Sequence, residues 1–298
     1  GGTTGSIDLT ISGGTGTYAY DWGAGQPTTQ DRTGLAAGTY AVTVTDGNGC
    51  TKSTSVTISE PSAIVLSTTQ VNVLCNGGTT GSIDLTVSGG AGAYTYNWGA
   101  GQPTTQDRTG LAAGTYTVIV TDGNGCTKTT SVTITQPSAM VLSTTQVNVL
   151  CNAGTNGSID LTVSGGSGAY TYNWGAGQPT SQDRTGLTVG TYTVIVTDGN
   201  GCTKTTSVTI TQPLVLAVST SSTTITCFAG NNGTATASAS GGTGPYQYQW
   251  STGAVSPSIS NLTSGGYFVF VKDFNLCETQ GQVIVVSKSI LVVRVYVC

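Results

Sequence analysis

The stretch GTYTVIVTDGNGC at residues 114–126 decides the fold expected for this chain. Its large apolar residues Tyr116, Val118 and Val120 alternate with other side chains, a period of two that is typical of a β-strand with one face on a core. The Asp-Gly-Asn-Gly that follows, residues 122–125, is rich in residues that tolerate positive φ and favours a hairpin turn. The stretch therefore predicts a strand, a tight turn and the start of a second strand.

The segments around this hairpin show the same pattern. Glycine-rich breaks at residues 76–81, 89–93 and 99–103 separate short runs rich in Thr, Val, Ile and Tyr. Each run is too short for a helix of ordinary length and alternates as a strand does. We therefore predict an all-β protein built as an antiparallel sandwich. The other predicted strands are IVLSTTQVNVLC (64–75), GSIDLTVSG (81–89), YTYNW (94–98) and TKTTSVTIT (127–135).

The whole pattern recurs at a period of 76 residues. Residues 62–137 and 138–213 differ at only seven aligned positions. A period of this length fits one small domain per repeat. We predict a partial repeat at 1–60, repeats at 61–136 and 137–212, and a divergent repeat at 213–287. Residues 288–298 are predicted to be the first strand of a following domain or a donor strand for a neighbouring subunit. Residue 1 falls within a repeat, so the chain is interpreted as a piece of a longer protein.

Tryptophan and tyrosine positions indicate the immunoglobulin-like class. Trp98 ends the middle strand, where such sandwiches carry a core tryptophan, and Tyr116 follows a loop as the tyrosine corner does. We predict tandem immunoglobulin-like β-sandwiches of the PKD or fibronectin-III type, with both residues packing in the core. The predicted core signature is Trp22, Trp98, Trp174, Trp250, Tyr40, Tyr116, Tyr192 and Tyr267.

The composition argues against catalysis and against nucleic acid. Charged residues make up 7% of the chain and histidine is absent, so no acid–base pair recurs between repeats. The nine Lys and Arg residues are scattered and form no basic stripe. No apolar run reaches the roughly 18 residues that span a bilayer, so no membrane insertion is expected. No cofactor is predicted; Asp122 and Asn124 match only the start of a calcium loop, which leaves calcium at domain junctions as a secondary hypothesis. The adjacent Asp107 and Arg108 are expected to be solvated.

The motif CNGGTTGSIDLTVSGGAGAYTYNW at residues 75–98, followed by LAAGTYTVIVTDGNGC at 111–126, resembles the SprB-type repeat of giant cell-surface proteins of Bacteroidetes. That group includes mobile gliding adhesins exported by the type IX secretion system. The resemblance covers essentially the whole chain, and the copy at 213–287 departs most. It implies a surface-exposed filament used in adhesion or gliding.

Two cysteines per repeat in a His-free, Thr-rich chain favour disulfides and an extracellular location over a zinc site. Strand parity favours a bond within each repeat, with Cys50 pairing upstream of residue 1. The two cysteines of a simple sandwich would, however, lie at opposite ends, beyond disulfide reach. Bonds across the junctions therefore stay open, either Cys50–Cys75 or a longer skip such as Cys75–Cys202. The predicted disulfide residues are Cys75, Cys126, Cys151, Cys202, Cys227 and Cys277, with Cys75–Cys126, Cys151–Cys202 and Cys227–Cys277 as the preferred pairs.

Two functions fit these features. The first is a structural segment of an extracellular bacterial filament or adhesin, whose partners are neighbouring repeats and surface polysaccharide. The second is an array of carbohydrate-binding modules, which would need an exposed aromatic residue in every copy to stack on sugar rings. Strand parity places the aromatic residues inside and favours the first. The positions that decide between the two are Tyr20, Tyr96, Tyr172 and Tyr248.

Overall fold

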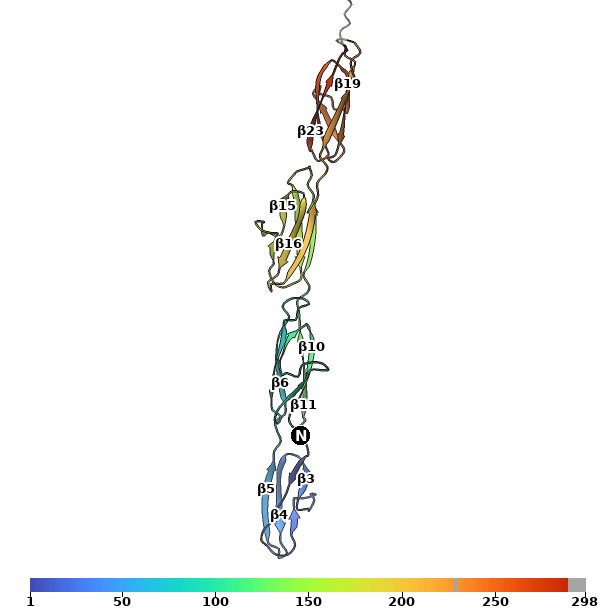
Figure 1. Cartoon of the computed structure of the whole chain (residues 1–298). Helices are drawn as coiled ribbons and strands as arrows, with labels where there is room; N and C mark the ends of the chain where they lie inside the picture. The colour runs from blue at the N-terminus through green and yellow to red at the C-terminus, as the bar shows by residue number, and fades with distance from the viewer. Residues whose placement is uncertain (228–229, 289–298) are drawn as a thin grey trace, which may run out of the picture. The chain divides into compact units, whose positions relative to one another are not determined.

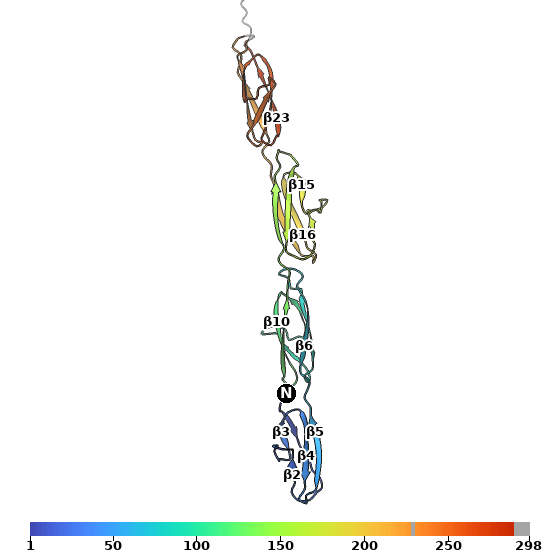
Figure 2. The same ribbon diagram turned by 180° about the vertical axis from the view of Figure 1, so that it is seen from behind.

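The computed structural model describes residues 1–227 and 230–288, and within them it contains twenty-three strands and no helix. These residues fall into two compact units. The first unit comprises Gly1–Val73 and Thr79–Thr135, and the second comprises the loop Leu74–Gly78 and the chain from Gln136 onward. Each unit holds two β-sandwiches, which Figure 1 shows as pairs of small facing sheets and Figure 2 shows from behind. The all-β prediction is confirmed.

The second repeat illustrates the sandwich. One sheet has the order β6-β7-β9 and the other the order β8-β10-β11, with all pairs antiparallel. In chain order this places the first, second and fourth strands opposite the third, fifth and sixth, which is the strand distribution of immunoglobulin-like domains. The strands are β6 (Val65–Val71), β7 (Gly81–Ser88), β8 (Thr95–Asn97), β9 (Arg108–Leu111), β10 (Gly114–Thr121) and β11 (Thr127–Ile134).

The other repeats have the same sheet order. The first repeat has β1 (Gly5–Ile7), β2 (Ala19–Asp21), β3 (Arg32–Leu35), β4 (Gly38–Thr45) and β5 (Thr51–Ile58). The third has β12 (Val141–Val147), β13 (Gly157–Ser164), β14 (Thr171–Asn173), β15 (Arg184–Leu187), β16 (Gly190–Thr197) and β17 (Thr203–Ile210). The fourth has β18 (Ala217–Ser222), β19 (Gly233–Ser240), β20 (Gln247–Trp250), β21 (Ser258–Leu262), β22 (Gly265–Lys272) and β23 (Glu278–Val285).

The hairpin that opened the sequence argument forms as expected. β10 pairs with β11 without interruption from Gly114 opposite Ile134 to Thr121 opposite Thr127. Val118 and Val120 are buried, whereas Ile119 on the other face is exposed. The period of two therefore sorts the residues of this strand between core and solvent.

Each repeat buries a core of its own. The third core centres on Ile159, Leu161, Trp174, Val194 and Val196, and equivalent clusters form in the other three repeats. The boundaries predicted at 60/61, 136/137 and 212/213 fall in strand-free segments between the last strand of one repeat and the first of the next. Residues 289–298, on which the donor-strand hypothesis rests, lie outside the described residues.

Candidate functional site

The recurring tryptophans and corner tyrosines are core residues. Trp174 is 8% exposed, and its indole N–H donates to the carbonyl of Ser181 at 2.9 Å. The hydroxyl of Tyr192 donates to the carbonyl of Thr188, four residues upstream, at 3.0 Å, which is the hydrogen bond of a tyrosine corner. The same two bonds form at Trp22, Trp98 and Trp250 and at Tyr40, Tyr116 and Tyr267.

The tyrosines that decide between a spacer and a sugar-binding module are half-buried. Tyr20, Tyr96, Tyr172 and Tyr248 pack against the core of their own repeats. The hydroxyl of Tyr172 donates to the Gln182 side chain at 2.9 Å, and Tyr96 bonds Gln106 in the same way. Burial is also the largest cause of the raised pKa of the Tyr96 and Tyr172 hydroxyls. These rings are engaged within the sandwich and do not stand free for stacking.

The expectation that Arg108 is solvated is wrong. Arg108 is 8% exposed, and its guanidinium lies over the Trp98 ring, 5.5 Å from the ring centroid. Its Nη2 donates to Gln102, whereas its Nη1 is buried without a hydrogen-bond partner. Arg32 and Arg184 repeat this arrangement on Trp22 and Trp174. The long side chain covers the open end of the core, and the face of the indole offsets part of the cost of burying its charge.

The preferred pairing of cysteines within each repeat is wrong. The structure joins Cys75 to Cys202 and Cys151 to Cys277, each with a Cα–Cα distance of 5.6 Å. This is the longer skip that the sequence left open. Cys50, Cys126 and Cys227 are exposed and have no disulfide partner among the described residues.

Strand direction explains the correction. In the third repeat, Cys151 follows β12 and its loop bonds the chain after β17, whereas Cys202 precedes β17 at the opposite end. A strand of eight residues spans roughly 27 Å, and disulfide geometry requires Cα atoms within about 7 Å. The two cysteines of one repeat therefore cannot meet, but each meets a cysteine from the facing end of an adjacent repeat.

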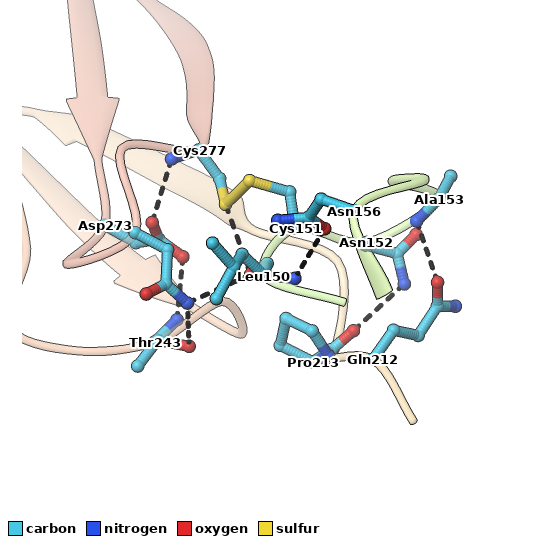
Figure 3. The surroundings of a disulfide bond; sticks show 11 residues. Leu150, Cys151, Asn152, Ala153, Asn156, Gln212, Pro213, Thr243, Asp273 and Cys277 are labelled. Atoms are coloured by element: carbon cyan, nitrogen blue, oxygen red, sulfur yellow. Dashed lines mark hydrogen bonds between the residues drawn. A yellow bond between two sulfur atoms is a disulfide. The ribbon is translucent and has the colours of Figure 1, made fainter. Parts of the chain in front are cut away.

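The junction around Cys151 and Cys277 is the best-defined polar site of the second unit (Figure 3). The carboxylate of Asp273 accepts the backbone N–H of Cys277 at 2.9 Å and that of Thr243 at 2.8 Å. Asn275 in the same turn donates from Nδ2 to the carbonyl of Leu150 at 3.0 Å. The turn of the fourth repeat thus holds its cysteine in place and also binds the loop of the third repeat directly.

The third-repeat loop is fixed to the linker in turn. Asn152 donates from Nδ2 to the carbonyl of Pro213 at 3.0 Å, and the Ala153 N–H donates to Gln212 Oε1 at 2.8 Å. On the strand side, the Val149 N–H donates to the carbonyl of Thr211 at 3.0 Å. Loop, linker and turn are therefore bonded to one another as well as through the disulfide (Figure 3).

The bond between Cys75 and Cys202 repeats this geometry. Asn200 donates to the carbonyl of Leu74 at 2.9 Å, where Asn275 uses Leu150. Asn76 donates to the carbonyl of Pro137 at 3.0 Å, and the Gly77 N–H donates to Gln136 Oε1 at 2.8 Å. All these residues lie in the second unit, so the loop Leu74–Gly78 is grouped with the repeat that follows it.

Asp198 organises the turn that presents Cys202. It is 5% exposed; burial alone would raise its pKa, but the backbone N–H groups of Cys202, Ser167 and Asn200 together lower it below the ordinary range. Hydrogen bonds to the ionised form hold the carboxylate charged. The Asp-x-Asn-x-Cys turn thus uses its aspartate as an internal acceptor of backbone N–H groups.

A glycine pair brings the linker against this turn. Gly165 has φ of 74°, and a Cβ there would lie 2.1 Å from the carbonyl oxygen of Ala139. Only glycine combines positive φ with this close approach at low cost. The next residue, Gly166, donates its N–H to the carbonyl of Ser138. The Gly-Gly of each repeat therefore serves the entry of the chain into the sandwich.

Sequence reasoning missed the polar residues of the junction. The aspartate and asparagine of the DGNG turn were interpreted as hairpin formers, which they are, but their contact with the preceding repeat was not predicted. Asn76, Asn152, Gln136 and Gln212 were not singled out. Their recurrence beside a cysteine or a linker proline in every copy was the available signal.

Comparisons with known proteins agree with this architecture. The strand order, the core tryptophan and the tyrosine corner define a tandem array of immunoglobulin-like β-sandwiches. The SprB repeat family matches residues 1–27, 67–103, 143–179 and 219–255. The chain therefore contains four SprB repeats, one in each sandwich, as the sequence motif predicted. A search of curated proteins gives no match.

Solved immunoglobulin-domain chains resemble this one only in fold. Sidekick-1 immunoglobulin domains 1–5 share 10% identity, covering 96% of this chain and 77% of that one with a TM-score of 0.37. Titin domains I67–I69 share 15% identity, covering 76% and 99% with a TM-score of 0.35. These identities bear on fold and not on function. Within the described residues, no helix is long and apolar enough to cross a membrane.

Proposed function

We propose that this chain is a structural segment of an extracellular bacterial surface filament or adhesin, giving length, stiffness and surface attachment, including attachment during gliding. The observation that carries the proposal is the pair of disulfides that run between repeats. A bond within a domain would stabilise that domain alone. A bond between repeats fixes the junction, which is where a string of domains bends.

The four SprB repeats support a cell-surface location, since disulfides persist in oxidising surroundings. No catalysis is assigned to this segment. Its primary partners are neighbouring repeats, and surface polysaccharide is a further partner engaged by many weak contacts whose avidity comes from repetition. The half-buried state of Tyr96 and Tyr172 supports the filament over an array of sugar-binding modules.

Small-angle X-ray scattering tests the filament role. The oxidised chain is expected to give a narrow size distribution, and a Cys75→Ser, Cys151→Ser double variant a broader one, because its junctions are free to bend. Cys126→Ser is the matched control and should leave the scattering unchanged, since Cys126 is unpaired. Equal flexibility of the oxidised chain and the double variant would contradict the proposal.

A glycan microarray tests the alternative. The filament role predicts no tight binding of any single glycan by the chain. Micromolar binding that is lost in a variant with all four deciding tyrosines changed to alanine would instead support carbohydrate-binding modules.

A further inference from the structure

We propose that the two disulfides interlock so that they bear load, and that they limit how far the array lengthens even when its sandwiches unfold. This mechanical function rests on the proposed filament role. It requires only the covalent connectivity and the direction of the strands at each junction.

The bonds enclose overlapping segments. The bond Cys75–Cys202 closes a loop with a sequence separation of 127, and the bond Cys151–Cys277 closes one of 126. Cys151 lies inside the first loop and Cys202 lies inside the second. Neither loop can therefore open to its full length without drawing on residues that the other bond also encloses.

The strands next to the linkers are the covalent spans of each repeat. In the third repeat, β12 leads from the first junction to Cys151, and β17 leads from Cys202 to the second junction. Both spans run in the same direction and are already extended, since they are β-strands. Tension between the two junctions is carried by these two strands in parallel.

The middle of the repeat lies outside these spans. β13, β14, β15 and β16, with the buried Leu161 and Trp174, all lie between Cys151 and Cys202. Unfolding this part of the sandwich removes its core but leaves β12 and β17 joining the junctions. The folded middle then serves to hold the strands in register and does not itself transmit the tension.

In an array that repeats this pairing, the shortest covalent route advances two repeats for the 25 residues from one bonded turn to the next bonded loop, as from Cys202 to Cys227. That route holds one final strand, one linker and one first strand, here β17 and β18. Its taut length is about 85 Å. Two repeats without the bonds would extend to more than 500 Å.

Single-molecule force spectroscopy of the oxidised chain, tethered at both ends, tests the connectivity. The shortest route in this chain runs from Gly1 to Cys75, from Cys202 back to Cys151, and from Cys277 to the end. The fully stretched oxidised chain should measure about 500 Å and the reduced chain about 1,000 Å. An oxidised chain that reaches the reduced length would overturn the proposal.

Single substitutions separate interlocked bonds from bonds within repeats. Cys151→Ser leaves the loop of 127 intact and should lengthen the stretched chain by only about 85 Å. Cys126→Ser should leave it unchanged. Bonds within repeats would instead give about 180 Å for either variant, and that outcome sinks the proposal. The measurement requires no surface, so failure of the filament role and failure of the load path are distinguishable.

Discussion

The third and fourth repeats have the same strand order but different cores. Ile159 and Leu161, both fully buried on β13, correspond to Ala235 and Ala237 on β19. Arg184, stacked on Trp174, corresponds to Ile259, and Trp250 is then only 2% exposed. The fourth repeat thus fills the space beside its tryptophan with a smaller apolar set.

Closer contact between its first and last strands accompanies the smaller core. Thr220 on β18 donates from Oγ1 to the carbonyl of Gln282 on β23 at 2.8 Å, and Ser222 bonds Ile284 in the same way. Between them, Gly281 faces Thr220 and Val218, where a Cβ would meet side-chain atoms at 3.0 Å. The sandwich tolerates a change of core volume when the strands can approach.

The junction, by contrast, is the same in both repeats. Phe274 and Leu276 replace the two glycines of the turn, yet Asn275 contacts Leu150 as Asn200 contacts Leu74. Leu276 adopts φ of 65° at the position where Gly201 has 82°. The comparison teaches that the core can be repacked while the turn that holds the cysteine keeps its geometry, even in a conformation that costs leucine.

The largest expected effect is in the third core. Leu161→Ala places the fourth-repeat residue in the third repeat, where no closer strand approach compensates, and should cost about 3 kcal/mol. Amide hydrogen exchange of β13 measures this loss within the repeat. Thr162→Ala on the outward face is the control. A loss below about 1 kcal/mol would show that the third sandwich collapses around the small residue.

Arg184 gives the next effect. Arg184→Ala removes the cover of Trp174 and should cost about 2 kcal/mol. Arg184→Ile, which supplies the fourth-repeat residue, should cost less than about 1 kcal/mol because it also removes the buried unpaired Nη1. Hydrogen exchange of β14 and β15 distinguishes the two variants. Equal losses would mean that the charge, and not the covered area, stabilises the site.

Leu276→Gly should stabilise the fourth repeat by about 1 kcal/mol, because it removes a side chain from the left-handed region. The reverse change, Gly201→Leu, should destabilise the third repeat by a similar amount. Hydrogen exchange across the β22–β23 and β16–β17 turns checks both. Two changes of the same sign would refute the equivalence of the turns.

The smallest effect at neutral pH concerns Asp198. Because its pKa is lowered by folding, its contribution to stability is complete above the unfolded value of about 3.9 and is lost as the pH falls through the folded pKa. Asp198→Asn sets an amide against the backbone N–H of Ser167 or of Cys202, so stability should fall at pH 7 and its acid dependence should become shallower. Melting temperatures from pH 7 to pH 2 test this. An acid dependence unchanged from the native chain would contradict it.

How far the sequence reached is clear from particular residues. The alternation Tyr116, Val118, Val120 and the glycine-rich turns specified strands, faces and class, because these are local properties of the backbone and of burial. Arg108 was placed wrongly since an arginine next to an aspartate in a loop carries no local sign that it will lie across a tryptophan ten residues away.

The sequence by itself determined the repeat, the immunoglobulin-like sandwich, its core tryptophan and tyrosine, and the presence of disulfide cysteines. Only the tertiary structure decided which cysteines meet. Parity states the face on which a cysteine lies but not the end of the sandwich it occupies. That end depends on strand direction over the whole domain, so Cys75 and Cys126 are kept apart while Cys75 reaches Cys202.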